Sequence, residues 1–70
     1  MSTEHLVQMA NQIARFFAAY PEQEAVAGVE NHISKFWAPD MRDQLLQHIA
    51  GGGEGLSPLV TRAMAGSENG

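Results

Sequence analysis

The sequence predicts an all-α protein, a small bundle of three main helices followed by a short C-terminal helix. Apolar residues recur every three or four positions, which is the spacing of one face of a helix. No segment alternates apolar and polar residues for long enough to form a strand. Prolines and glycines separate the periodic segments, where they can start or stop helices. Because the connections are short, consecutive helices should be antiparallel or steeply angled neighbours.

The first helix is predicted over residues 4–20. Its apolar face consists of Leu6, Met9, Ile13, Phe16, Phe17 and Tyr20. Ser2 or Thr3 can cap its start, since a hydroxyl oxygen accepts a hydrogen bond from a free amide of the first turn. Pro21 ends this helix because a proline disfavours helical geometry in the residue before it.

The second helix is predicted over residues 21–37, with Pro21 suited to its first position. Its apolar stripe consists of Val26, Val29, Ile33, Phe36 and Trp37. Gly28 lies inside this helix at a cost of about 1 kcal/mol relative to alanine. Two interpretations of Gly28 stand: a tolerated weak spot, or a position where another backbone approaches closely because no side chain is present.

The third helix is predicted over residues 41–50, with Asp40 as its cap and the glycines at 51–53 as its stop. Its apolar positions are Met41, Leu45, Leu46 and Ile49. The fourth is predicted over residues 58–65, with Ser57 as cap and Pro58 at the first position. We therefore expect a single helical domain over residues 1–65 and a flexible tail over residues 66–70.

Composition narrows the possible functions of this 70-residue chain. It has no cysteine, which excludes disulfides and cysteine-based metal sites. Its net charge is −4 and its four basic residues are scattered, so we expect no nucleic-acid or membrane partner. It shows no signal peptide and no apolar run long enough to span a bilayer, which favours a cytoplasmic location. Only 17% of its residues are charged, which suggests that a partner or a second copy covers part of the surface.

Sites for catalysis, metal or phosphate are poorly supported by the sequence. His5, His32 and His48 lack the helical-turn spacing typical of zinc and iron ligands, so we expect them at the surface. The glycine-rich segment 51–55 lacks the lysine and preceding strand of a phosphate-binding loop. A linker is therefore the preferred interpretation, and an anion site at the backbone of the fourth helix remains the alternative. No serine has an evident activating base, so we expect no active site.

The aromatic residues form two adjacent pairs and one single position. They are Phe16, Phe17, Tyr20, Phe36 and Trp37. One interpretation places all five in the core. In the other, one or more are exposed and mark an interface, because adjacent helical residues point in different directions and a small domain has little room for both.

Several short segments resemble the delta subunit of NAD-dependent, molybdenum-containing formate dehydrogenases, over about residues 5–64. They are MANQI at 9–13, HI at 32–33, KFWAP at 35–39, MR at 41–42 and GLSPLV at 55–60. The resemblance implies a non-catalytic accessory subunit of a cytoplasmic complex that oxidises formate and reduces NAD⁺. It implies support for assembly, stability or molybdenum-cofactor insertion in the catalytic alpha subunit. The bis-molybdopterin guanine dinucleotide, iron–sulfur clusters and FMN would belong to other subunits, with no cofactor bound by this chain.

The expected partner is the alpha subunit, and the expected contact face comprises seven residues. They are Phe36, Trp37, Pro39, Arg42, Leu56, Pro58 and Leu59. Arg42 suits a bidentate contact to a carboxylate or a phosphate, and its alternative is a solvated charge on a helix. A different class of function, an independent homodimeric adaptor or regulatory module, also accounts for the low charge and the small core.

Overall fold

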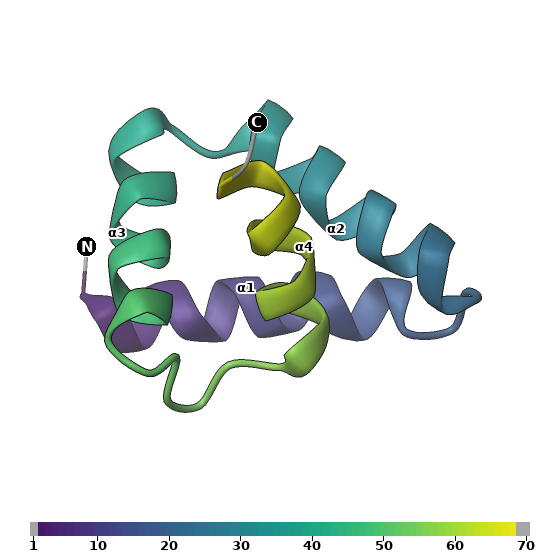
Figure 1. Cartoon of the computed structure of the whole chain (residues 1–70), viewed down its shortest axis with the longest axis horizontal. Coiled ribbons are helices and arrows are strands. Elements are labelled where there is room, and N and C mark those ends of the chain that lie inside the picture. The colour runs from purple at the N-terminus through teal and green to yellow at the C-terminus, as the bar shows by residue number, and fades with distance from the viewer. Residues whose placement is uncertain (1, 69–70) are drawn as a thin grey trace.

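The computed structural model describes residues 2–68, with side chains described for residues 2–65. Four helices and no strand lie within that range, namely α1 (Thr3–Phe17), α2 (Glu22–Phe36), α3 (Pro39–Ala50) and α4 (Pro58–Glu68). The predicted all-α bundle is therefore confirmed. Helix α1 extends along one side, α3 and α4 stand across it, and α2 returns obliquely above it (Figure 1). Helix α2 packs against α1 and α4, and α1 also contacts α3.

The starts of α1 and α4 follow the predicted capping. The Ser2 hydroxyl accepts a hydrogen bond from the backbone N–H of His5 at 3.2 Å. Ser57 accepts one from the backbone N–H of Leu59 at 3.3 Å, and Pro58 is the first residue of α4.

The starts of α2 and α3 differ from the prediction. Helix α2 begins at Glu22, and Pro21 precedes it as the cap instead of occupying its first position. In α3, Ala38 is the cap and Pro39 occupies the first helical position, so the expected cap at Asp40 is wrong. The fixed φ angle of proline is already helical, which allows the helix to begin at Pro39. Asp40 then lies in the first turn, where its negative charge interacts favourably with the helix dipole.

Two helix ends also differ from the sequence prediction. Helix α1 stops at Phe17 rather than Tyr20, and the N–H of Tyr20 donates to the carbonyl of Phe17 at 3.0 Å in the turn that follows. Helix α4 continues through Gly66 to Glu68, since one glycine costs only about 1 kcal/mol and does not end a helix by itself. The predicted tail at 66–70 thus overlaps α4, and its residues 69–70 lie outside the described part.

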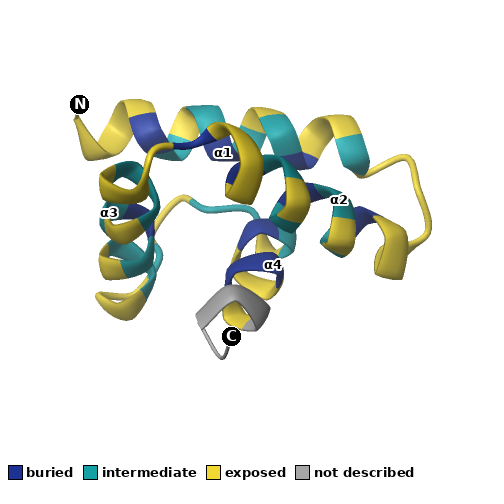
Figure 2. Ribbon diagram, turned by 90° about the horizontal axis from the view of Figure 1, so that it is seen from above, coloured by how far each residue is buried: buried dark blue, intermediate teal, exposed yellow. Residues whose placement is uncertain are grey.

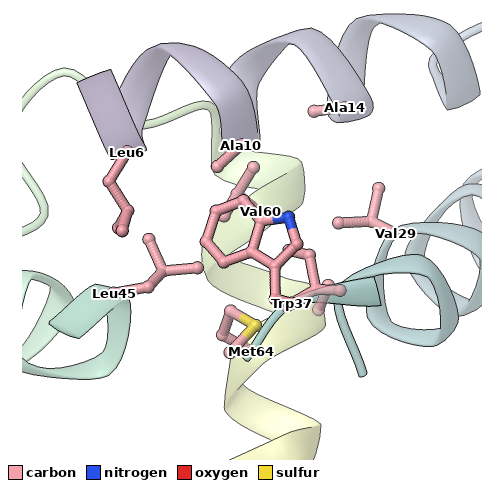
Figure 3. Packing of buried hydrophobic residues seen from close by; sticks show 10 residues of the cluster. Leu6, Ala10, Ala14, Val29, Trp37, Leu45, Val60 and Met64 are labelled. Atoms are coloured by element: carbon pink, nitrogen blue, oxygen red, sulfur yellow. The ribbon is translucent and has the colours of Figure 1, made fainter. Parts of the chain in front are cut away.

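The core lies where the four helices meet, with the indole of Trp37 among aliphatic side chains from all of them (Figure 3). The buried residues are Leu6, Ala10, Ala14, Ala25, Val29, Ile33, Trp37, Leu45, Val60, Ala63 and Met64. They occupy the sides of the helices that face one another, and exposed residues cover the outer sides (Figure 2). Apolar burial on this scale is the main stabilising contribution in so small a domain.

Gly28 in α2 is a site of close approach. A Cβ atom built at Gly28 would lie 2.5 Å from two ring carbons of Phe17 in α1. The second interpretation of this glycine therefore agrees with the structure, except that the approaching group is an aromatic ring and not a backbone.

The segment between α3 and α4 is a linker tied to α1 by one side chain. The Asn11 amide donates to the carbonyl of Gly55 at 2.9 Å, and its oxygen accepts from the N–H of Ser57 at 2.8 Å. The His48 ring is 2.8 Å from the carbonyl of Glu54. Residues far apart in the sequence thus determine the path of this glycine-rich connection.

Candidate interaction surface

One member of each adjacent aromatic pair is exposed and the other is turned inward. Phe36 is 72% exposed whereas the neighbouring Trp37 is 6% exposed. Phe16 is 69% exposed, and its ring meets the half-buried ring of Phe17 edge to face at 5.0 Å. Tyr20 is 50% exposed. The interpretation that places all five aromatic residues in the core is therefore wrong for three of them.

The exposed ring of Phe16 borders an apolar groove of about 400 Å³ between α1 and α2. Its lining comprises Met9, Gln12, Ile13, Phe16, Phe17, His32 and Trp37. The ring of Phe36 contacts that of His32 at a tilted angle with 4.8 Å between centroids, which extends the apolar surface from the groove to the end of α2. No carboxylate and no lysine or arginine lines this groove, so it is suited to apolar or aromatic groups.

The first group of predicted contact residues lies at the connection between α2 and α3. Phe36 and Pro39 are exposed there, and Arg42 is half-buried one turn into α3. Trp37 requires a correction, because its side chain belongs to the core and only its edge borders the groove. The sequence could not separate the two members of this pair, since both fit an apolar stripe.

The second group of predicted contact residues lies away from the first. Leu56, Pro58 and Leu59 surround the start of α4, which lies at the lower side of the molecule in Figure 1, whereas the α2–α3 connection lies at its upper side. Pro58 is exposed, whereas both leucines are half-buried and pack against the core. The expected single face is thus divided into two separate areas.

The guanidinium of Arg42 has one unsatisfied donor. Its Nε atom is buried and has no hydrogen-bond partner, and no other buried side-chain nitrogen or oxygen of the described residues shares this state. A buried donor without an acceptor costs about 1 to 3 kcal/mol.

Sequence reasoning missed most of the groove. The sequence predicts Met9 and Ile13 on the apolar face of the first helix and His32 at the surface, and it gives no prediction that these residues share a site. The signal that could have found the groove is the pairing of adjacent aromatics on both helices, which requires one ring of each pair to turn outward.

Other polar features of the described residues are sparse. No group of three or more histidines, cysteines and carboxylates among them could hold a metal ion. A more polar hollow of about 430 Å³ lies beside the glycine-rich linker and includes His48, Glu4 and Glu54 in its lining. None of the helices described here is both long and apolar enough to cross a membrane.

Comparison with protein families gives a match that covers nearly the whole chain. The family described as NADH-dependent formate dehydrogenase delta subunit, FdsD, matches residues 5–64. Comparisons with curated proteins and with solved structures gave no match. The matched range contains the linker, the groove and all seven of the predicted contact residues. The chain therefore belongs to the family of formate dehydrogenase delta subunits.

Proposed function

We propose that this chain is a non-catalytic accessory subunit that binds the molybdenum-carrying alpha subunit of a cytoplasmic formate dehydrogenase. In this proposal it supports assembly, stability or cofactor insertion in the alpha subunit and carries out no redox step. The observation that carries the proposal is the family match over residues 5–64 of a 70-residue chain. Because a delta subunit functions as part of a complex, an uncovered apolar surface is expected on the isolated chain.

The surface composition supports a role in binding. Phe16, Tyr20 and Phe36 are at least half exposed, and aromatic residues are common anchors of protein interfaces. The absence of cysteine from the sequence supports the assignment of iron–sulfur clusters to other subunits, since such clusters are held mainly by thiolates.

We propose that the alpha subunit covers the corner formed by Phe36, Pro39 and Arg42. Two of these residues are exposed, and the third holds the unsatisfied Nε donor. A carboxylate of the alpha subunit, or a phosphate of the molybdenum cofactor during loading, would pair with the positive charge of Arg42. The Leu56, Pro58 and Leu59 area would form a smaller second contact in this proposal.

The experiment compares the enzyme produced with and without this chain. With an affinity tag on the full chain, we expect near-stoichiometric recovery of the alpha subunit. Without the chain, we expect less molybdenum per alpha subunit or a lower unfolding temperature of the enzyme. Recovery of the tagged chain alone, together with an alpha subunit that has full molybdenum content and unchanged stability, would overturn the proposal.

Variants of Arg42 test the contact itself. Arg42→Lys keeps the positive charge but removes the planar fork of donors, and Arg42→Ala removes both. If the planar fork contacts the alpha subunit, we expect both variants to recover less alpha subunit. If Arg42 is only a solvated charge, Arg42→Lys should recover as much alpha subunit as the wild type.

A further inference from the structure

We infer that the groove between α1 and α2 is the docking site for an amphipathic helix of another formate dehydrogenase subunit. The inference rests on the proposed function and specifies the surface and the chemistry of the contact. It differs from the face expected from the sequence, because five of its seven lining residues come from α1.

The dimensions of the groove suit a helix. From Met9 to Phe17 the groove follows α1 for eight residues, which is about 12 Å or two helical turns. Apolar side chains spaced three, four and seven residues apart on a partner helix would fit a hollow of this length. The half-buried Phe17 and the buried Trp37 form its inner wall, so an entering side chain would meet a surface already held by the core.

The charges around the groove indicate the flanks of that helix. Arg15 and Lys35 lie three residues after the lining residues Gln12 and His32, on the same side of their helices. Glu24 lies one turn before Gly28, which is next to the ring of the lining residue Phe17. The three charges that flank the groove are therefore two positive and one negative, with a sum of +1, whereas the whole chain has a net charge of −4. Both basic side chains are exposed. Acidic residues beside the apolar stripe of the partner would therefore be complementary.

The same charges disfavour a second copy of the chain as the occupant. Two copies carry −4 each, and pairing them through this groove would bring two similarly charged rims together. An acidic-flanked helix of a different subunit avoids this repulsion.

The groove is also continuous with the corner proposed to contact the alpha subunit. Phe36 belongs to that corner, and its ring contacts the tilted ring of His32 in the groove lining, with 4.8 Å between centroids. One partner surface can thus cover the corner and place a helix in the groove.

The test measures binding of the full chain to the enzyme produced without it. Phe16→Ala should weaken binding by about 30-fold or more, as truncation of an interface anchor does. Phe16 is mostly exposed, so the variant should keep the fold, which circular dichroism and urea unfolding would verify. Lys35→Glu should weaken binding most at low salt. Arg62→Glu makes the same charge change on a residue paired with Glu22 and outside the groove lining, and should leave binding unchanged.

Crosslinking identifies the occupant. With a photoreactive phenylalanine analogue in place of Phe16, we expect a crosslink to a helix of another subunit that has acidic residues beside an apolar stripe. A crosslink between two copies of this chain would overturn the inference. Normal binding by the Phe16→Ala and Lys35→Glu variants would also overturn it, while leaving the accessory function intact. If the wild-type chain does not bind the enzyme at all, the proposed function fails and the inference fails with it.

Discussion

The contact between Gly28 and Phe17 predicts whether a substitution at Gly28 stabilises or destabilises the protein. An exposed glycine inside a helix is normally improved by alanine, by about 1 kcal/mol. At Gly28 the added methyl group would lie 2.5 Å from the Cδ1 and Cε1 atoms of Phe17, whereas ordinary carbon contacts are about 3.5 to 4.0 Å. The ring must therefore retreat by about 1 Å or more, and overpacking of this kind costs about 1 to 3 kcal/mol. We expect Gly28→Ala to destabilise the protein by about 1 kcal/mol.

A second substitution, at Phe17, should make Gly28→Ala stabilising instead of destabilising. Phe17→Leu keeps an apolar side chain but removes the ring, so Gly28→Ala made in this background should stabilise the protein by about 1 kcal/mol. The difference between the two backgrounds is a coupling energy of about 2 kcal/mol, within the range for residues in contact. The exposed neighbour Ala27 provides the matched control, since Ala27→Gly should cost about 1 kcal/mol through helix propensity alone.

The assay is urea unfolding followed by far-ultraviolet circular dichroism and by fluorescence of Trp37, the single tryptophan of the chain. Gly28→Ala, Phe17→Leu and the double variant form a double-mutant cycle with the wild type, and Ala27→Gly is measured beside them as the control. The reasoning is refuted if Gly28→Ala stabilises the wild-type protein as much as it stabilises Phe17→Leu. In that case the Phe17 ring does not occupy the space beside Gly28, and the inner wall of the groove is not as described.

Three further predictions concern the core, the linker and the first cap. Trp37→Ala should destabilise the protein by about 3 to 5 kcal/mol because the side chain is buried, whereas Phe36→Ala should change the urea midpoint little. Asn11→Ala removes both hydrogen bonds that hold the linker, so the amide of Ser57 should exchange faster with solvent and stability should fall by about 1 to 3 kcal/mol. An unchanged rate of hydrogen exchange at the Ser57 amide would show that Asn11 does not hold the linker. Ser2→Ala should cost about 1 kcal/mol, measured as a lower midpoint, and no change would show that the hydroxyl is not the cap.

Local features of the sequence were sufficient for the helices and most of their boundaries. The spacing of apolar residues identified all four helices, and Pro58 and the hydroxyls of Ser2 and Ser57 marked two starts. Such signals are local, since a cap acts on amides within its own first turn. The errors at Pro21, Asp40 and Tyr20 are shifts of one to three residues, where neighbouring residues compete for the same role.

The family resemblance was also available from the sequence, and the family match over residues 5–64 confirms it. The sequence predicted only in part which aromatic residues are exposed and which are buried. Adjacency implied that one ring of each pair could turn outward, but apolarity alone could not distinguish Phe36 from Trp37. That choice depends on where α3 and α4 leave room for an indole (Figure 3).

The sequence by itself therefore determined the fold class, the order of the helices and the family, because these follow from periodicity, caps and short motifs within one segment. Only the tertiary structure decided which side of each helix meets a neighbour. It placed the Phe17 ring against Gly28, joined Asn11 to a linker more than forty residues away, and left an apolar groove between α1 and α2. The physical reason is that burial is a property of packed pairs of helices: the same apolar residue is core or surface according to what lies opposite it.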